Sequence, residues 1–499
     1  MSLDATIRAA IASPATDADF DAHTHLEELL NTIGMSSSDS GGKISFRGAD
    51  PILPSALRLA GATGIALAAK AVAMARLWRL RGGPGQDISV DLRVAPHRLC
   101  PFYDGRWELM DGHPIPNLAA ASNAFGYKHF YRTLDDRWVM PLNPYPKIRR
   151  RAELLLGVPD DPTAVARAIA TWKASDLEQA GEEAGIVMPA VRSVSEFLAV
   201  RQFTEHLAAL PLIEIEKIGD SDPVPFTPNP KAPLSGVRVL GRAHIIAGAG
   251  NGRAMALHGA DVLNIWQPDE YEIETMYCTS NVGVRSSRLN IRSRAGRHVF
   301  DGLMQSADVF YSNRRPGYLE SLGLDPAQLA ETRPGIIHSS VTLHGHAGPW
   351  SKRVGFDQTA GCLAGIMDLE GDDEKPSLPP LPVVNDYITA WLGTIGIVEA
   401  LTRRATEGGS YRVHVSLSRT ALWILSLGVI DKAYAIATHG TGYEHAYVDP
   451  EHFVADTPLG RYTGIGENVH MSETPGKYPH ILIPRGSSRP VWLDHAAAK

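Results

Sequence analysis

Three glycines follow a predicted strand in the stretch HIIAGAGNGRAMALHGADVLNIW, residues 244–266. Gly248, Gly250 and Gly252 form GxGxG before an Ala-rich helical segment, and the amide groups at the start of such a helix can bind a phosphate or another anion. A dinucleotide-binding turn requires GxGxxG and an acidic residue at the end of the next strand, where this chain has Trp266. The pattern argues against NAD and leaves an anion-binding turn and a ligand-free tight turn as alternatives.

A second candidate is Asp386, which follows an apolar strand-like piece in LPVVNDYITAWLGTIGIVEAL and begins a predicted helix. A carboxylate in this position can act in chemistry, or it can simply cap the helix. The residue types around it do not decide between these two roles.

Arginines are concentrated in RSSRLNIRSRAGR, residues 285–297, and in the turn NRRPG, residues 313–317. Guanidinium groups match phosphates in shape and charge, so both segments are candidate anion sites. The alternative is surface charge that balances an acidic chain. The turn is the more informative of the two, because a predicted strand, ADVFYSN, enters it and Pro316 and Gly317 end it sharply.

Asp21, His23 and His25 spell DxHxH, which would suggest a metal-dependent hydrolase if it lay at the end of a barrel strand. Metal binding by alternate residues requires an extended backbone. The flanking TDADF and LEELL instead predict a helix, so a solvated helix face is the favoured interpretation, and no metal site is predicted.

The composition is that of a folded protein: 44% of the 499 residues are hydrophobic and 21% are charged, enough for two or more domains. The net charge of −7 gives no reason to expect nucleic acid or an anionic membrane as a partner. No run of about 20 apolar residues is evident. Cys100, Cys278 and Cys362 lie far apart, which favours neither a disulfide framework nor a zinc site. We therefore expect a soluble, cytoplasmic protein.

Short β-rich runs alternate with helical ones after residue 234, a rhythm that predicts a parallel sheet with crossover helices. Five prolines in the stretch after Gly219 mark the clearest linker. The predicted organisation is an N-terminal helical appendage (1–45), a partial copy of a large-domain helix-strand unit (46–95), a small α/β domain (96–220), a linker (221–233), a large Rossmann-like domain (234–430) and a C-terminal tail that packs on it (431–499).

An internal similarity supports the partial copy. Residues 62–92 and 393–417 share a Gly-Ile entry, a long helix, a Gly-Gly stop and a strand that ends in Leu. When the two Gly-Ile pairs are aligned, Asp386 corresponds to Pro54, so a carboxylate is available in the second copy alone.

Residues 234–430 resemble the class III CoA-transferases, the CaiB/BaiF or formyl-CoA transferase family. The similarity is carried by the order and spacing of PLSGVRVL, HGADVLNIW, NVGVRSSRLNIRSRAGRHVF, ADVFYSNRRPGYLESLGLD, RPGIIHSSVTLHGHAGPW, RVGFDQTAGCLAGIM and VVNDYITAWLGTIGIVEAL. Residues 182–198 resemble the family's small domain, and residues 453–476 its C-terminal segment. The small domain here precedes the large one, as in a tandem ancestor trimmed at both ends or a permuted fusion.

The resemblance implies an α/β fold, a CaiB/BaiF-type parallel-sheet large domain with a smaller mixed α/β domain. It implies coenzyme A and acyl-CoA as substrates, with a carboxylic acid as acceptor and no permanently bound cofactor. It makes Asp386 the nucleophile, which at an ordinary pKa of about 3.9 is ionised at pH 7 and attacks a thioester without a base. The residues expected to contact CoA are His244, Ile246, Ala247, Arg285, Asn313, Arg315 and His344.

Two departures keep other functions open. Ile246 replaces a glutamine frequent in the formyl-CoA branch, which argues against oxalate or formate. Acyl-CoA racemases of the family use a histidine in GHD, where this chain has Phe356, so a racemase would need another base, for which His344 is the nearby candidate. The alternatives are therefore an acyl-CoA racemase and a catalytically degenerate CoA-binding subunit. Family members are interlocked dimers, and we expect a homodimer, although a fused chain could supply both halves of the site itself.

Overall fold

The computed structural model describes residues 2–116 and 123–493. Its largest feature is a seven-stranded sheet in the order β10-β9-β8-β11-β12-β13-β7. All neighbouring strands are parallel except β7, which pairs antiparallel with β13. The strands are β7 (Glu214–Gly219), β8 (Arg238–Arg242), β9 (Asp261–Trp266), β10 (Arg285–Arg288), β11 (Val309–Ser312), β12 (Ile337–Thr342) and β13 (Ser410–Ser416). The expected parallel α/β architecture is confirmed.

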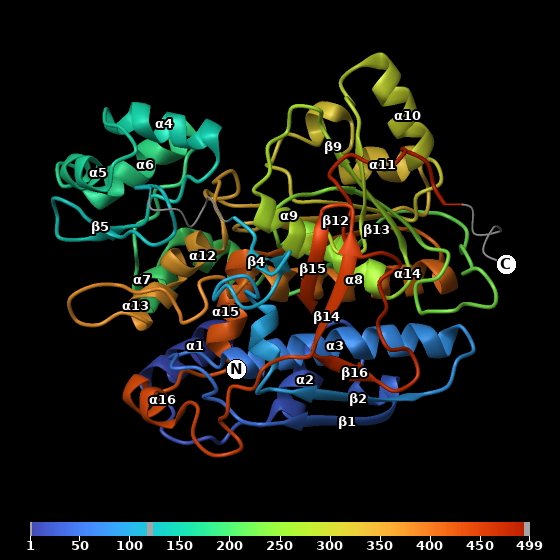
Figure 1. Ribbon diagram of the computed structural model, residues 1–499, viewed down its shortest axis with the longest axis horizontal. Coiled ribbons are helices and arrows are strands. Elements are labelled where there is room, and N and C mark those ends of the chain that lie inside the picture. Colours follow the sequence, from blue (N-terminus) through green and yellow to red (C-terminus); the bar gives the residue numbers. More distant parts are fainter. Residues whose placement is uncertain (1, 117–122, 494–499) are drawn as a thin grey trace.

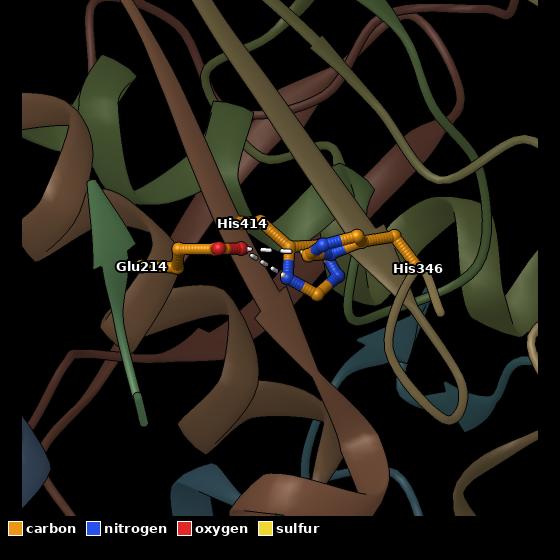
Figure 2. Close-up of side chains that lie close together, drawn as sticks. All are labelled: Glu214, His346 and His414. Carbon is orange, nitrogen blue, oxygen red and sulfur yellow. Dashed lines mark ion pairs between the residues drawn. The ribbon is translucent and has the colours of Figure 1, made fainter. Parts of the chain in front are cut away.

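Strand β7 lies outside the predicted large-domain range of 234–430. Its residues, 214–219, fall in the segment that the sequence analysis gave to the small domain, yet they form the edge of the large sheet. In this pairing Glu214 stands opposite His414 of β13 (Figure 2).

Helices cover both faces of the sheet, and alternate strand residues point to opposite faces. Val239 and Val309 pack in the core cluster that contains α3 (Leu59–Leu80), α8 (Ala249–Leu257) and α14 (Asp386–Glu407). Leu240 and Phe310 pack on the other face, with residues of α10 (Arg294–Met304) and α11 (Pro326–Thr332). These layers are visible in Figure 1, with α10 and α11 above the sheet and α3 below.

Helix α3 is long and apolar enough to cross a membrane by length and composition alone, with a mean hydropathy of 1.3. The expectation that the chain has no apolar run of about this length is therefore wrong. In the structure 94% of that apolar stretch is buried, against α14, α2 (Ala22–Asn31) and β2 (Gln86–Asp91). A helix packed on all sides is apolar on all sides, which explains the composition without a membrane.

The predicted internal repeat has a structural counterpart. Helix α3 leads into β2 as α14 leads into β13, and the two helices pack on each other. Strand β2 lies in a three-stranded sheet between β1 (Gly41–Arg47), which is parallel to it, and β16 (Val469–Met471). The predicted boundary at residue 45 therefore falls inside β1.

The DxHxH segment is helical, as expected. Asp21 caps α2, where its carboxylate accepts the His23 amide at 2.9 Å, and the His25 ring lies 2.9 Å from Glu28 on the helix surface. Helix α1 (Leu3–Ala12) precedes it.

A smaller unit stands beside the sheet, at the left of Figure 1, and has its own core of residues such as Tyr131, Ile148 and Leu177. Strands β5 and β6 pair antiparallel as a short hairpin. The unit's elements are β5 (Tyr131–Arg132), β6 (Trp138–Val139), α4 (Pro146–Leu156), α5 (Pro162–Ile169) and α6 (Ala174–Ala184).

The C-terminal segment packs on more than the large domain. Strands β14 (His452–Thr457) and β15 (Gly460–Ile465) form a four-stranded sheet with β3 (Leu109–Met110) and β4 (His113–Pro114). The remaining elements are η1 (Ser37–Ser40), η2 (Ala95–Arg98), α7 (Val194–Leu198), η3 (Phe203–Leu207), α9 (Glu274–Ser280), η4 (Glu320–Leu322), α12 (Asp357–Ala364), α13 (Ile366–Leu369), α15 (Leu417–Ser426) and α16 (Lys432–Thr438).

Candidate active site

A cleft of about 470 Å³ opens at the carboxyl ends of β8, β11 and β12, the edge of a parallel sheet at which ligands generally bind. One wall comes from the loops after these strands, and the other comes from the smaller unit around α4. The residues that line the cleft include Tyr145, Lys147, Arg151, His244, Ile245, Asn313, Arg314, Arg315, Thr342, Arg353 and Phe356.

The cleft is cationic. Five of its lining side chains carry positive charge, and none of the described residues that line it is acidic. Within the described parts of the chain, Lys147, Arg151 and Arg315 form no ion pair with a carboxylate, whereas Arg353 pairs with Glu182 at 2.8 Å. Unpaired cations around an open cavity favour a ligand with several negative charges.

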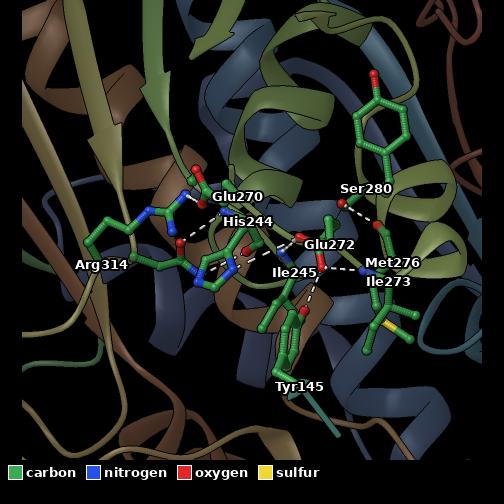
Figure 3. A network of polar contacts seen from close by, with 12 residues as sticks. Tyr145, His244, Ile245, Glu270, Glu272, Ile273, Met276, Ser280 and Arg314 are labelled. Atoms are coloured by element: carbon green, nitrogen blue, oxygen red, sulfur yellow. Dashed lines mark hydrogen bonds and ion pairs between the residues drawn. The ribbon is translucent and has the colours of Figure 1, made fainter. Parts of the chain in front are cut away.

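Arg314 is held in place by Glu270, which also pairs with Arg242 at 2.8 Å (Figure 3). Burial opposes ionisation of this carboxyl, but Arg314 and Arg242 together hold the pKa of Glu270 at about 2. Arg314 is therefore a fixed part of the wall and less available to a ligand than Arg315.

The turn after β8 has an unusual backbone. Ile245 has a φ of +57°, a conformation that a β-branched residue rarely adopts. Glu272 supports it: its carboxyl accepts the Ile245 amide at 3.0 Å and a hydrogen bond from the Tyr145 hydroxyl (Figure 3). Burial raises the pKa of Glu272. This contact also ties the smaller unit, through Tyr145, to the large sheet.

Asp386 is the first residue of α14, with 6% of its surface exposed. It lines two small cavities of about 50 and 80 Å³. The larger of these shares Ile245, Asn313, Thr342 and other lining residues with the cleft. Phe356 and Ile245 border all three spaces.

A second carboxyl group, Asp357, lies directly behind Asp386. Its oxygens accept backbone amides from Val384 at 3.1 Å, Asn385 at 2.6 Å and Asp386 at 2.8 Å. Burial raises the pKa of Asp357 to about 6, although these amides act in the opposite direction. Asp357 therefore fixes the start of α14, and it places a like charge beside the predicted nucleophile.

The assumption of an ordinary pKa for Asp386 is wrong. Burial raises its pKa well above 3.8, and the charge of Asp357 raises it further. The sequence placed this residue at a helix start, where a carboxylate is usually solvated. The apolar neighbours that remove that solvent, such as Ile245, Ile246 and Phe356, become visible only in the folded chain.

The three glycines after β8 allow close packing of the helix that they begin. A Cβ atom would lie 2.3 Å from Asn313 at Gly248, 2.9 Å from Ala390 at Gly250 and 2.3 Å from the Tyr311 hydroxyl at Gly252. These distances are below any normal contact, so the glycines let α8 approach β11 and α14. Of the two alternatives left by the sequence, the structure favours the tight turn, because α8 is buried throughout.

Five of the seven predicted CoA-contact residues gather around Asp386. His244, Asn313 and Arg315 line the cleft, while Ile246 and Ala247 line the small cavities beside Asp386. Asn313 also braces the turn, because its amide nitrogen donates to the His244 carbonyl at 2.8 Å. That these residues contact CoA stays a prediction.

The other two lie elsewhere. Arg285, on β10, pairs with Asp261 at 2.8 Å and donates to the Val491 carbonyl at 2.8 Å, so it holds the C-terminal segment. His344 is buried with its Nδ1 atom 2.7 Å from Ser418 Oγ, and it borders a cavity of about 30 Å³ that shares lining residues such as Arg353 with the cleft but is not lined by Asp386. Burial lowers the pKa of His344 well below its ordinary value.

Sequence reasoning missed Tyr145, Lys147, Arg151 and Arg353, and gave Asp357 and Glu272 no role. One signal was present: NPYPKIRRR, residues 143–151, starts a helix with a proline and places several cations on it. That this helix faces Asp386 depends on how the smaller unit docks.

Known proteins and a family model match the central region of the chain. Residues 234–455 match the model of CoA-transferase family III. An acetyl-coenzyme A transferase from Hypoxylon pulicicidum is 32% identical over 212 residues, 41% of this chain and 36% of that protein. The alpha subunit of a succinyl-CoA–L-malate CoA-transferase from Chloroflexus aurantiacus is 29% identical over 221 residues, 41% of this chain and 52% of that protein. The chain thus spans about half or less of the length of these relatives.

Among solved structures, a CaiB/BaiF family protein from Brucella suis aligns with a TM-score of 0.37 and 26% identity, over 46% of this chain and 65% of that one. The matched region contains the carboxyl edge of the sheet, the NRRPG turn and Asp386. Residues 234–455, less than half of the chain, are therefore similar to CoA-transferase family III, and the smaller unit lies outside this match.

Proposed function

We propose that this protein transfers coenzyme A from an acyl-CoA thioester to a carboxylic acid, with Asp386 as the covalent nucleophile. One observation carries the proposal: the Asp386 carboxyl borders cavities that share walls with a cationic cleft. The names of the relatives support the reaction class, since the proteins named above are CoA-transferases.

The proposed reaction exchanges acyl groups without an external energy source. A carboxylate oxygen of Asp386 attacks the thioester carbonyl, which forms a mixed anhydride and expels the CoA thiolate. The thiolate then attacks the aspartyl carbonyl, which releases the donor acid and leaves an aspartyl-CoA thioester. The acceptor carboxylate attacks this thioester, and the returning thiolate takes the acceptor acyl group, which regenerates the Asp386 carboxylate.

The cations of the cleft suit the phosphates of CoA. Lys147 and Arg151 approach from the smaller unit, and Arg315 approaches from the loop after β11. In this arrangement the pantetheine arm runs inward past Phe356 toward Asp386. The acyl group then occupies the inner cavity, whose wall includes Leu142, Ile246 and other apolar side chains.

Asp386 must lose its proton before it can attack. Burial and Asp357 favour the protonated form when nothing is bound. A thioester bound in the cavity lined by Ile245 and Phe356 meets a carboxylate with little hydration, and a poorly hydrated anion is a strong nucleophile. The same environment excludes water, which would hydrolyse the anhydride.

The experiment is a transfer assay on the full chain with a panel of acyl-CoA donors and carboxylic acid acceptors. We expect Asp386→Asn to abolish transfer while CoA still binds in a calorimetric titration. The control is Asp368→Asn, which changes an exposed carboxyl on α13 that lines neither the cleft nor the cavities beside Asp386. Transfer that survives in Asp386→Asn, or fails equally in Asp368→Asn, would rule out the assignment.

The racemase alternative gains no support from the site. Racemisation requires two groups that exchange a proton on opposite sides of the α-carbon. Phe356 occupies the position of the family's histidine, and His344 borders a different cavity from Asp386. Incorporation of solvent deuterium at the α-carbon, in the absence of an acceptor acid, is the result that would restore this alternative.

A further inference from the structure

Three metal-ligating side chains that the proposed reaction does not use converge at the edge of the large sheet (Figure 2). Glu214 comes from β7, His414 from β13 and His346 from the loop after β12. Their potential ligand atoms all lie within 4.8 Å of one another. The strand register brings Glu214 and His414 together, because they are direct partners in the β7-β13 pairing.

The distances suit a tetrahedral ion. The Glu214 Oε2 atom lies 3.3 Å from Nδ1 of His414 and 3.5 Å from Nδ1 of His346. Bonds of about 2.0 to 2.1 Å from zinc to nitrogen and oxygen require about 3.3 to 3.4 Å between neighbouring ligand atoms of a tetrahedron. The two distances from Glu214 to the histidines are therefore already close to this value. The half-exposed His346 ring can rotate to adjust the third distance, between the two histidine nitrogens.

The environment of His414 leaves one ring nitrogen free. Its side chain is 2% exposed, and its Nε2 atom lies 2.9 Å from the hydroxyl of Thr342. Nδ1 of His414 and Oε2 of Glu214 are both buried without a hydrogen-bond partner in the described structure. Either a proton on Nδ1 or a metal cation between the two atoms would satisfy both of them.

An arginine beside the cluster fixes the direction of its carboxylate. Arg412 lies 3.2 Å from the other oxygen of Glu214, Oε1, and so orients the carboxylate with Oε2 toward the two rings. Groups that orient ligands in this way are typical of metal sites.

We propose that Glu214, His346 and His414 bind a divalent cation of the zinc class, with water as the fourth ligand. Two histidines and a carboxylate are a ligand set that zinc and neighbouring divalent metals accept. The ion would join the antiparallel edge strand β7 to the loop after β12. Through Thr342, which hydrogen-bonds to His414 and lines the cleft, it would also stiffen one wall of the cleft.

The test uses the full chain without an affinity tag, dialysed against a chelator. Titration with Co²⁺, followed by visible absorption, reports the coordination geometry, and competition with Zn²⁺ gives the affinity. We expect one ion per chain, a tetrahedral Co²⁺ spectrum and a higher melting temperature with Zn²⁺. His346→Ala should weaken binding by about 100-fold or more and abolish the thermal shift, since loss of an outer partner alone costs about 10- to 100-fold.

His346 is the preferred variant because its side chain is 39% exposed and its removal leaves the core intact. The matched control is His206→Ala, another half-exposed histidine beside a glutamate, Glu205, at 4.0 Å, and it should bind metal as the unmodified chain does. The proposal is overturned if the unmodified chain binds neither ion stoichiometrically, or if His346→Ala retains the spectrum and affinity.

Discussion

At the scale of single residues, the site depends on two carboxyl groups with different tasks. Asp357 uses its oxygens to accept the amides at the start of α14, while Asp386 points its carboxyl at the cavities. Like charges in a buried position cannot both ionise easily, so the pair titrates as a unit. The structural role of one thus controls the reactivity of the other.

This coupling predicts a pH dependence. Because the pKa of Asp386 is raised, kcat/KM should fall as the pH is lowered and the nucleophile takes up its proton. Asp357→Asn removes the neighbouring charge, so the acid limb of the profile should move to lower pH. The measurement is the pH dependence of kcat/KM for both proteins, with circular dichroism to confirm folding. An acid limb that stays in place would show that Asp357 does not affect the nucleophile.

The cations predict a second result. Arg315→Ala should raise the Kd for CoA by about 10- to 100-fold, since a charge-assisted hydrogen bond contributes about 1.5 to 3 kcal/mol. Arg132→Ala, which changes an exposed arginine of the smaller unit that pairs with Asp136, is the control and should leave the Kd unchanged. Isothermal titration with CoA measures both. Equal affinity in the Arg315 and Arg132 variants would place the phosphates elsewhere.

Part of this site could be predicted from the sequence. Asn313 and Arg315 follow β11 within the matched motifs, so their place at the carboxyl edge of the sheet follows from chain order. Asp386 follows an irregular segment, because the apolar piece before it, expected to resemble a strand, forms none. Tyr145 and Arg151 could not be found in this way, because they reach the cleft only through the docking of a separate unit. The raised pKa of Asp386 was equally hidden, because it arises from packing.

At the scale of elements, the contact between α13 and the segment before α3 offers a stability test. Glu370 follows α13, and its carboxyl accepts the Ser55 hydroxyl and the Ala56 amide. Burial raises its pKa to about 7. In an unfolded chain the same group titrates near 4.3. The folded state therefore holds a proton that the unfolded state releases over this interval.

The sign of the effect follows directly. The stability that Glu370 contributes is fully present below about pH 4.3 and is lost as the pH rises through about 7. Glu370→Gln keeps the shape and cannot ionise. The difference in unfolding free energy between the unmodified chain and this variant should therefore fall by roughly 4 kcal/mol across that interval. Denaturant unfolding at several pH values measures it, and a constant difference would contradict the assigned burial.

The elements of the large sheet were predictable because apolar strands alternate with helices from residue 234 onward. Strand β7 was not, because EIEKIG stands before a proline-rich linker and its partner β13 lies far along the chain. Pairing between distant segments leaves no local trace in composition. The cluster of Glu214, His346 and His414 could not be predicted for the same reason, because its residues come from segments that are distant in the sequence.

At the scale of the whole molecule, both walls of the cleft come from one chain. The smaller unit provides Lys147 and Arg151, and the large sheet provides Asp386. The homodimer expected from the sequence stays a prediction. Among the described residues, the smaller unit and the large sheet of one polypeptide provide both walls of the cleft.

Because one chain supplies both walls of the cleft, we predict that activity does not depend on dimer formation. The rate per chain should stay constant when the protein is diluted through any dimer dissociation, which sedimentation velocity locates at the same concentrations. A rate that falls in parallel with the dimer fraction would mean that the partner chain contributes to the site.

The most direct test of the account is the mass of the intact protein after incubation with an acyl-CoA and rapid quenching. We predict a species heavier by one CoA less one water, as expected for a thioester, with fragmentation that places it on Asp386. Asp386→Asn should show no such species. An enzyme that turns over its substrate without any adduct at Asp386, or with an adduct on another residue, would contradict the central claim.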